Sequence, residues 1–308
     1  MMEYDIVIVG AGPAGLSAAI YGKRAGKKVL ILEKQSYGGQ IINTPAVENY
    51  PGIPMISGFA FASALYQQVV DLGAEIKYEK VNGIAEEGNF KIIQTDQASY
   101  RGRTVILATG ARNRPLGLEG EQEWIGAGVS YCAACDGMFY KGKTTAVVGG
   151  GNTALEDALI LSEYCRKVYL IHRRDTFRGE AVRLHILEEK DQVEILRDSQ
   201  VTKLHGKDRL EGITVIHHKE EKTREISVDG LFVAIGQMPE NDAFYNVVKL
   251  DFAGYILAGE ECRTSTPGIF AAGDCRTKEI RQLTTAAADG TIAALQACSY
   301  LYKHFSFL

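Results

Sequence analysis

The sequence lacks the features that define several large classes of protein. Its 308 residues carry a net charge of only −4 at pH 7, whereas binding to nucleic acid or to an anionic membrane requires a basic surface. The apolar runs, such as residues 6–9 and 105–108, are far shorter than the ~20 residues needed to cross a bilayer. The chain enters a strand within its first residues, so we expect no signal peptide and a cytoplasmic location.

Metal ligands are also scarce. The chain has six cysteines, and two of them, Cys132 and Cys135, form a Cys-x-x-Cys pair. A structural zinc site needs two further ligands, usually a second spaced pair, and neither the six histidines nor the other cysteines supply one. We therefore predict no metal site and interpret Cys132 and Cys135 as a redox dithiol at the start of a helix. The solitary cysteines are expected to be small core or surface residues rather than ligands: Cys165, Cys262, Cys275 and Cys298.

The sequence does contain a dinucleotide-binding motif near its start. The apolar run 5–9 leads into Gly10-Ala11-Gly12-Pro13-Ala14-Gly15 and then into a periodic segment that predicts a helix to about residue 28. Gly10 would make the tight turn, Gly12 would let a pyrophosphate approach, and Gly15 would allow close helix packing. The next strand, 29–32, ends in Glu33, whose carboxylate can bind ribose hydroxyls and repels a 2′-phosphate. The alternative is an ordinary turn followed by a surface glutamate.

A second motif repeats the first with the same spacing. Gly149-Gly150-Gly151-Asn152-Thr153 follows another apolar strand, and the offsets agree, since 33 − 10 = 23 and 172 − 149 = 23. At the position of the acid stand His172-Arg173-Arg174, followed by Arg178. Guanidinium groups bind phosphate bidentately, so this motif predicts the 2′-phosphate of NADPH and leaves FAD for the first motif. A solvated basic face is the alternative.

The order of these motifs predicts the domain organisation. Buried strands at 105–108 and 231–235 each end in glycine and precede linker-like segments at 111–115 and 237–241. We predict an α/β fold with two Rossmann-like dinucleotide-binding domains. The NADPH domain, residues 115–240, carries the Cys-x-x-Cys pair and is inserted into a discontinuous FAD domain, residues 1–114 and 241–308.

Together these motifs resemble the low-molecular-weight thioredoxin reductases of the pyridine nucleotide-disulfide oxidoreductase family, nearly from end to end. The resemblance implies FAD, NADPH, a homodimer and thioredoxin as protein substrate. It implies FAD contacts from Gly10, Gly12, Pro13, Ala14, Gly15, Glu33, Gly39, Gln40, Asn49, Thr109, Gly110, Gly273, Asp274, Arg281 and Gln282. It implies NADPH contacts from Gly149, Gly151, Asn152, Thr153, His172, Arg173, Arg174 and Arg178. Independently, a helix beginning near residue 284 would direct its first amides, with Arg281, at a reduced flavin.

The same resemblance implies a path for the electrons. Hydride passes from NADPH to FAD, and the electron pair then reduces the disulfide of Cys132 and Cys135. Cys135 is expected to face the flavin and Cys132 to attack thioredoxin, while Asp136 protonates the leaving thiolate. From the residues alone, Asp136 has an alternative role as a helix cap. Because dithiol and NADPH share one domain, we expect that domain to swivel on its two linkers.

Several alternatives remain open at this point. A ferredoxin–NADP reductase would lack the dithiol, and a ferredoxin-fed relative would have no use for Arg173, Arg174 and Arg178. An NADPH-dependent reductase that feeds a peroxide-reducing system would need a separate dithiol carrier. A non-catalytic redox sensor would bind nucleotides without turnover. Finally, the apolar segment 300–305 would pack either against a partner subunit or against its own sheet.

Overall fold

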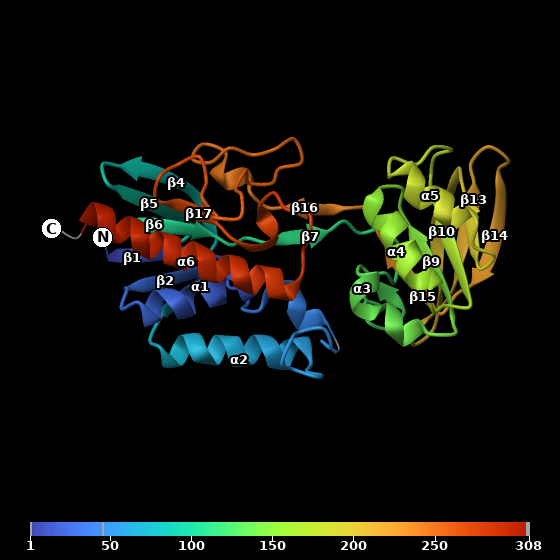
Figure 1. The fold of residues 1–308 in the computed structure, drawn as a ribbon, viewed down its shortest axis with the longest axis horizontal. Helices are drawn as coiled ribbons and strands as arrows, with labels where there is room; N and C mark the ends of the chain where they lie inside the picture. Colours follow the sequence, from blue (N-terminus) through green and yellow to red (C-terminus); the bar gives the residue numbers. More distant parts are fainter. Residues whose placement is uncertain (1, 45, 306–308) are drawn as a thin grey trace. The chain divides into compact units, whose positions relative to one another are not determined.

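The computed structural model describes residues 2–44 and 46–305. These residues form two compact units, shown in Figure 1. Unit 1 comprises the described residues up to Arg112 and from Met238 onward, and unit 2 comprises Asn113–Gln237. Each unit contains its own buried hydrophobic clusters.

Unit 1 is built on a sheet with the strand order β3-β2-β1-β6-β5-β4. Its parallel part contains β1 (Glu3–Val9), β2 (Val29–Glu33), β3 (Glu75–Tyr78) and β6 (Ser99–Leu107), and the antiparallel part adds β4 (Val81–Glu87) and β5 (Phe90–Thr95). A late strand, β17 (Ile269–Ala271), pairs in parallel with the C-terminal part of β6. The central strands are almost continuously apolar because both faces of the sheet are covered.

Helices cover one face of this sheet. α1 (Pro13–Arg24) and α6 (Leu283–Phe305) pack against each other there, and α2 (Gly58–Asp71) packs against α1 (Figure 1). Short 3₁₀ turns complete the unit: η1 (Gly39–Asn43), η3 (Asp242–Phe244) and η4 (Gly273–Cys275). The predicted first helix ends four residues early, at Arg24 rather than 28, because Gly26 follows with φ +71° and stops it.

Unit 2 repeats the same plan. Its parallel sheet has the order β11-β10-β9-β15-β8, formed by β8 (Val129–Ser130), β9 (Thr144–Val148), β10 (Lys167–Ile171), β11 (Val193–Leu196) and β15 (Gly230–Val233). An antiparallel layer adds β12 (Ser199–Gly206), β13 (Leu210–His217) and β14 (Lys222–Ser227). The helical elements are α3 (Ala133–Asp136), η2 (Gly137–Tyr140), α4 (Asn152–Ser162) and α5 (Ala181–Glu188). The predicted fold class, two Rossmann-like domains, is confirmed.

The two predicted linkers and the C-terminal segment all form regular secondary structure. The linker-like segments are not irregular, since β7 (Ala111–Asn113) and β16 (Gln237–Pro239) pair in a two-stranded sheet. The C-terminal segment packs against its own unit, because Leu301 and Phe305 are buried in the cluster beneath α6. Among the described helices, none is long and apolar enough to span a membrane.

Candidate functional site

The first glycine motif forms a tight loop between β1 and α1. Gly10 has φ +108°, and a Cβ there would lie 2.3 Å from the carbonyl oxygen of Ala108. A Cβ on Gly15 would lie 1.9 Å from the Gly10 carbonyl oxygen, so only glycine allows this approach. α1 begins at Pro13 after Gly12, without a side-chain cap. Its first backbone N–H groups are therefore available to a pyrophosphate.

Glu33 lies at the end of β2, next to this loop. One of its carboxylate oxygens accepts a hydrogen bond from the N–H of Ala11 at 2.8 Å, and the other accepts from the N–H of Gln35 at 3.0 Å. Each oxygen retains a second lone pair, so the carboxylate can still accept from ribose hydroxyls. The structure thus places Glu33 where the sequence predicted and shows that it also anchors the loop.

A second wall of this site comes from the C-terminal part of the chain. Gly273 lies against the start of α1, where a Cβ on it would be 2.9 Å from the Cβ of Ala14. The next residue, Asp274, carries a polar atom that suits a bound ligand. Among the described residues, nothing hydrogen-bonds its buried Oδ1, and burial raises the pKa of its carboxyl group. A hydroxyl-bearing chain such as the ribityl group of FAD would satisfy that oxygen.

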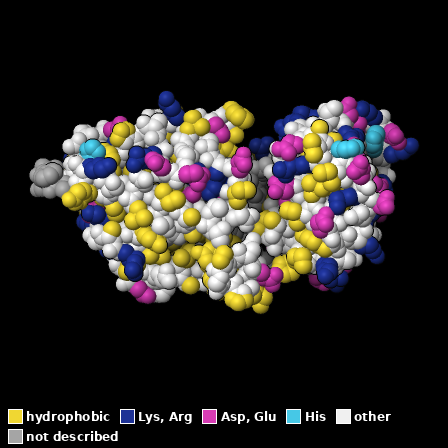
Figure 2. Space-filling view, in the orientation of Figure 1, with side chains coloured by type: hydrophobic (Ala, Val, Ile, Leu, Met, Phe, Trp, Pro, Cys, Tyr) yellow, Lys and Arg dark blue, Asp and Glu magenta, His cyan; other side chains and the backbone are white. Residues whose placement is uncertain are grey.

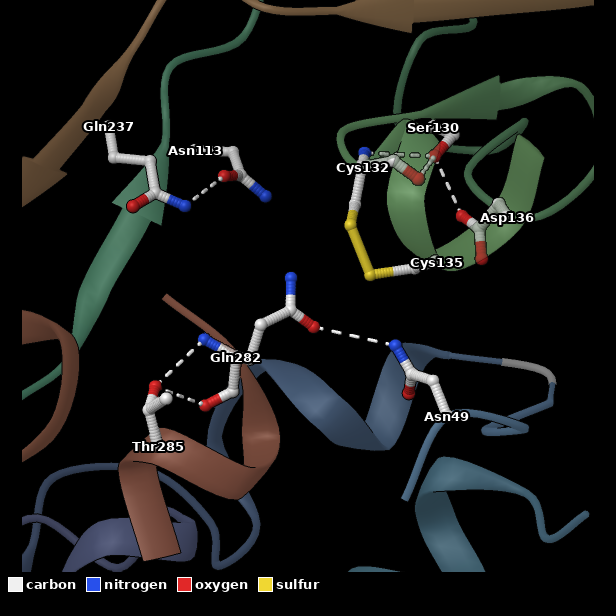
Figure 3. Close-up of a disulfide and its surroundings, with 9 residues drawn as sticks. All are labelled: Asn49, Asn113, Ser130, Cys132, Cys135, Asp136, Gln237, Gln282 and Thr285. Atoms are coloured by element: carbon white, nitrogen blue, oxygen red, sulfur yellow. Dashed lines mark hydrogen bonds between the residues drawn. A yellow bond between two sulfur atoms is a disulfide. The ribbon is translucent and has the colours of Figure 1, made fainter. Parts of the chain in front are cut away.

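The other residues predicted to contact FAD lie in the same unit. The Gly39 turn lies against Gly12, and Gln40 donates a hydrogen bond to the Ala111 carbonyl oxygen. Asn49 donates to the Gln282 side chain at 3.4 Å, which brings together residues far apart in sequence (Figure 3). The remaining predicted residues follow β6 or precede α6: Thr109, Gly110 with φ +70°, and Arg281, whose guanidinium lies 4.3 Å from the centre of the Tyr255 ring.

Sequence reasoning missed the buried groups that hold these segments in place. Asn241, predicted to lie in a linker, is buried, accepts a hydrogen bond from Thr109 at 2.8 Å and donates to the Cys275 carbonyl oxygen at 2.9 Å. Asp289 of α6 accepts bidentately from Arg276 and also accepts from the Gly273 N–H at 2.9 Å. In the sequence, this role of Asp289 is indicated by a charged residue on an otherwise apolar face of α6.

The second glycine motif forms an equivalent loop in unit 2. A Cβ on Gly149 would lie 2.3 Å from the Ala234 carbonyl oxygen, so the strand again passes close beneath the turn. Gly151 precedes α4 and faces open space. Asn152, the first residue of α4, accepts a hydrogen bond from the Glu180 N–H at 2.8 Å, while Thr153 is exposed in the first turn.

The basic residues of this motif fall into two groups. Arg173, Arg174 and Arg178 are exposed, and within the described chain their guanidinium groups have no hydrogen bond or ion pair. They are therefore available to a phosphate. His172 is buried instead: a Cβ on Gly150 would be 2.1 Å from its ring, and its Nε2 lies 3.1 Å from the Thr176 carbonyl oxygen. Burial, with help from the nearby arginines, lowers the pKa of His172, so a neutral ring supports the loop.

The Cys-x-x-Cys pair is a disulfide. Cys132 and Cys135 are joined, with 5.3 Å between their Cα atoms. Cys132 directly precedes α3, and Cys135 lies within it and is exposed. Among the described residues, no three His, Cys, Asp or Glu side chains group as metal ligands would. The pair is thus placed for thiol–disulfide exchange.

Asp136 lies at the end of α3 and does not act as a cap. Its side chain makes no capping hydrogen bond to η2; Oδ2 instead accepts from the Ser130 hydroxyl at 2.7 Å (Figure 3). Oδ1 is buried and has no partner in the described chain. Burial raises the pKa of Asp136, while the hydrogen bond from Ser130 opposes that rise. Such a carboxyl group retains its proton closer to neutral pH, as a general acid must.

A further buried acid packs against the disulfide turn. Asp157 falls on the apolar face of α4, with its side chain only 7% exposed. Burial raises its pKa to about 7, although a hydrogen bond from the backbone of Ala133 stabilises the carboxylate. A charged residue among the alanines and leucines of this helix face is a sequence signal of a buried acid, which the motifs alone do not reveal.

Two dinucleotide-binding units, one of which carries a disulfide beside a half-buried acid, define a nucleotide-dependent disulfide oxidoreductase. Residues 4–290 match the family described as pyridine nucleotide-disulphide oxidoreductase. The chain is 41% identical over 300 residues to the thioredoxin reductase of Treponema pallidum, covering 97% of both chains. It is 39% identical over 299 residues to the thioredoxin reductase of Listeria monocytogenes, covering 97% of this chain and 94% of that one.

Solved structures agree with this assignment. The crystal structure of thioredoxin reductase from Streptococcus pyogenes superposes with a TM-score of 0.93 at 38% identity, covering 98% of this chain and 99% of that one. The chain therefore belongs to the pyridine nucleotide-disulphide oxidoreductase family. Its cofactors are FAD and NADPH. The unpartnered Asp274 oxygen and the unpaired arginines fit these two groups respectively.

Proposed function

We propose that the chain is a thioredoxin-disulfide reductase that draws its electrons from NADPH. The observation that carries the proposal is the Cys132–Cys135 disulfide, which lies in the unit with the arginine-rich nucleotide loop and next to the half-buried acid Asp136. Relatives over almost the whole chain are thioredoxin reductases, which supports thioredoxin as the protein substrate.

Each unit has a defined task in this proposal. Unit 1 holds FAD: the Gly10–Gly15 loop binds the pyrophosphate, Glu33 the ribose and Asp274 the ribityl chain. Unit 2 holds NADPH, with Arg173, Arg174 and Arg178 around its 2′-phosphate. When bound, NADPH would supply a hydride, and FAD would supply the two-electron chemistry that connects NADPH with a disulfide. The protein positions these groups, and Arg281 with the first turn of α6 favours negative charge beside the flavin.

The cysteines and Asp136 carry out the exchange with thioredoxin. In the reduced enzyme, the Cys132 thiolate attacks the disulfide of thioredoxin and forms a mixed disulfide. Asp136 gives its proton to the thiolate that leaves. Cys135 then attacks the Cys132 sulfur, which releases the second thiol of thioredoxin and restores the Cys132–Cys135 disulfide. The enzyme dithiol is oxidised and the substrate disulfide is reduced, so electrons balance.

Thioredoxin-dependent turnover tests this function directly. We expect the FAD-loaded protein to oxidise NADPH anaerobically when oxidised thioredoxin is added. Cys132→Ser should abolish this turnover while NADPH still reduces the bound flavin. Cys298→Ser, which changes a solitary and only partly buried cysteine, is the matched control and should behave like the wild type.

The alternatives give different results in the same experiment. If flavin is reduced but neither wild type nor variant reduces thioredoxin, the acceptor is wrong, and a separate dithiol carrier becomes the better candidate. Binding of NADPH without flavin reduction would instead support a redox sensor. A ferredoxin-fed enzyme is disfavoured because the three unpaired arginines match a 2′-phosphate.

We also infer a homodimer and a cytoplasmic location, where NADPH is available. Residues 50–70, which include most of α2, contain no charged side chain. Met55 and Phe59 are 67% and 61% exposed there, and hydrophobic side chains are visible over this part of unit 1 in Figure 2. An exposed apolar surface of this kind is typical of a protein interface. Sedimentation should give a dimer, and Phe59→Glu should shift it toward monomer.

A further inference from the structure

Ser130 is a buried hydroxyl between the disulfide and Asp136. It ends β8, whose parallel pairing with β15 at Phe232 fixes its backbone, and its side chain is only 4% exposed. Its Oγ accepts a hydrogen bond from the Cys132 N–H at 3.1 Å and donates one to Asp136 Oδ2 at 2.7 Å (Figure 3). A single hydroxyl therefore contacts both residues on which the exchange reaction depends.

This hydroxyl decides which oxygen of Asp136 is available. Oδ2 is engaged by Ser130, whereas Oδ1 is buried and has no partner among the described residues. The hydroxyl can also satisfy both protonation states of Oδ2. It donates to the carboxylate, and if Oδ2 carries the proton it can accept instead and turn its own hydrogen toward the Cys132 carbonyl oxygen, 3.5 Å away.

We propose that Ser130 is a positioning residue for thiol–disulfide exchange, which holds Asp136 beside the disulfide and leaves Oδ1 as the proton-carrying oxygen. This inference rests on the proposed role of Asp136 as the acid. As the Cys132 sulfur bonds to one sulfur of thioredoxin, the substrate S–S bond breaks and the proton of Asp136 passes to the sulfur that leaves. The pre-set hydrogen bonds spare the acid any reorganisation during this step.

Other titratable groups lie around Asp136. Tyr140 belongs to η2, and the pKa of its phenol is raised mainly by burial and further by the charge of Asp136. From α4, Asp157 faces Ala133, and the Tyr164 hydroxyl lies against Gly137. Within this set, the Ser130 hydroxyl lowers the pKa of Asp136 against the effect of burial. Removing the hydroxyl should therefore raise that pKa and keep the acid protonated to higher pH.

Rapid-mixing kinetics on the full-length, FAD-loaded enzyme test the proposal. Flavin reduction by NADPH and the subsequent reduction of oxidised thioredoxin would be followed separately across pH 6 to 9. We expect Ser130→Ala to slow the thioredoxin step roughly tenfold at pH 7, as loss of one charge-assisted hydrogen bond implies. The decline of this step at high pH should move upward, with flavin reduction unchanged. Ser130→Thr retains a hydroxyl and should restore most of the rate.

Several results would overturn the proposal. These are a wild-type pH profile in Ser130→Ala, equal slowing of flavin reduction and exchange, or a Ser130→Thr variant as slow as Ser130→Ala. Asp136→Asn separates this inference from the proposed function. If Asp136→Asn leaves exchange unchanged, the acid itself is wrong; if it slows exchange while Ser130→Ala does not, only the positioning role fails. If Asp136 is the acid and Ser130 positions it, adding Ser130→Ala to Asp136→Asn should slow exchange little further.

Discussion

At the scale of single residues, the polar groups that matter are those buried without a full set of partners. Asp136 and Asp274 each have one buried oxygen that no described group satisfies. Leaving such an atom unpaired is costly in a folded protein. These oxygens are therefore the places where a proton, a ligand hydroxyl or a substrate completes the structure, and burial raises the pKa of both carboxyl groups.

Asp157 makes stability depend on pH. Burial raises its folded-state pKa to about 7, above the unfolded value, so the folded chain binds the proton more tightly and loses that stabilisation as pH rises toward 7. Asp157→Asn removes the titration. Relative to wild type, its free energy of unfolding should gain roughly 2 kcal/mol between pH 5 and pH 8, at 1.36 kcal/mol per pKa unit. Urea unfolding at both pH values measures this.

A suitable control for that experiment is Asp208→Asn, which changes an exposed aspartate in the same unit. The prediction fails if Asp157→Asn and Asp208→Asn respond alike to the change of pH. The active-site dithiol should be kept oxidised throughout, so that titration of its thiols does not contribute.

Arg178 should determine the preference for NADPH over NADH. Its guanidinium is exposed and makes no hydrogen bond or ion pair within the described chain, so its removal should leave the fold unchanged. We expect Arg178→Ala to raise KM for NADPH roughly tenfold, the value of one charge-assisted phosphate contact, and to leave KM for NADH unchanged. Arg209→Ala, another exposed arginine of unit 2, is the control. Equal changes for both nucleotides would contradict the assignment.

At the scale of elements, the strongly periodic and motif-bearing segments could be predicted from sequence. The strands before both glycine loops and the start of α6 lie where the pattern places them. Ser130 and Asn241 could not be assigned, because a hydroxyl or amide carries no sign of its partner until distant strands meet. Likewise, the position of His172 fits the phosphate motif, yet its buried ring packs closely against Gly150.

The contact between α1 and α6 provides a test at this scale. A Cβ on Gly290 would lie 2.1 Å from the carbonyl oxygen of Ala14. Alanine normally stabilises a helix interior by about 1 kcal/mol over glycine, but here it would push α6 away from the FAD loop. We expect Gly290→Ala to destabilise the protein by about 2 kcal/mol or more and to release FAD, measured by thermal unfolding and flavin absorbance.

Gly259→Ala is the corresponding control, because a Cβ there would meet nothing within 4 Å. It should change stability by no more than about 0.5 kcal/mol, as expected for a surface substitution. If Gly290→Ala were as stable as this control and retained its flavin, the close packing of the two helices would not matter for the FAD site.

At the scale of the whole molecule, each unit has hydrophobic clusters formed only by its own residues. The two clusters of unit 2 draw only on residues between 113 and 237. We therefore expect the isolated segment 113–237 to unfold cooperatively and to bind NADPH without FAD, measured by calorimetry. An isolated segment without a cooperative transition would show that unit 1 is needed for its folding. A folded segment that did not bind NADPH would instead contradict the assignment of NADPH to unit 2.

The pairing of β17 with β6 also has a consequence for synthesis on the ribosome. Ile269 pairs with Val105, although all of unit 2 lies between them in the sequence. Helix α6, which covers the same sheet, is synthesised later still. Unit 2 is contiguous and can fold once its last strand has emerged, whereas unit 1 must wait with an open sheet edge. The unit that appears first is thus completed last, and the FAD site proposed for it can be completed only after translation has passed α6.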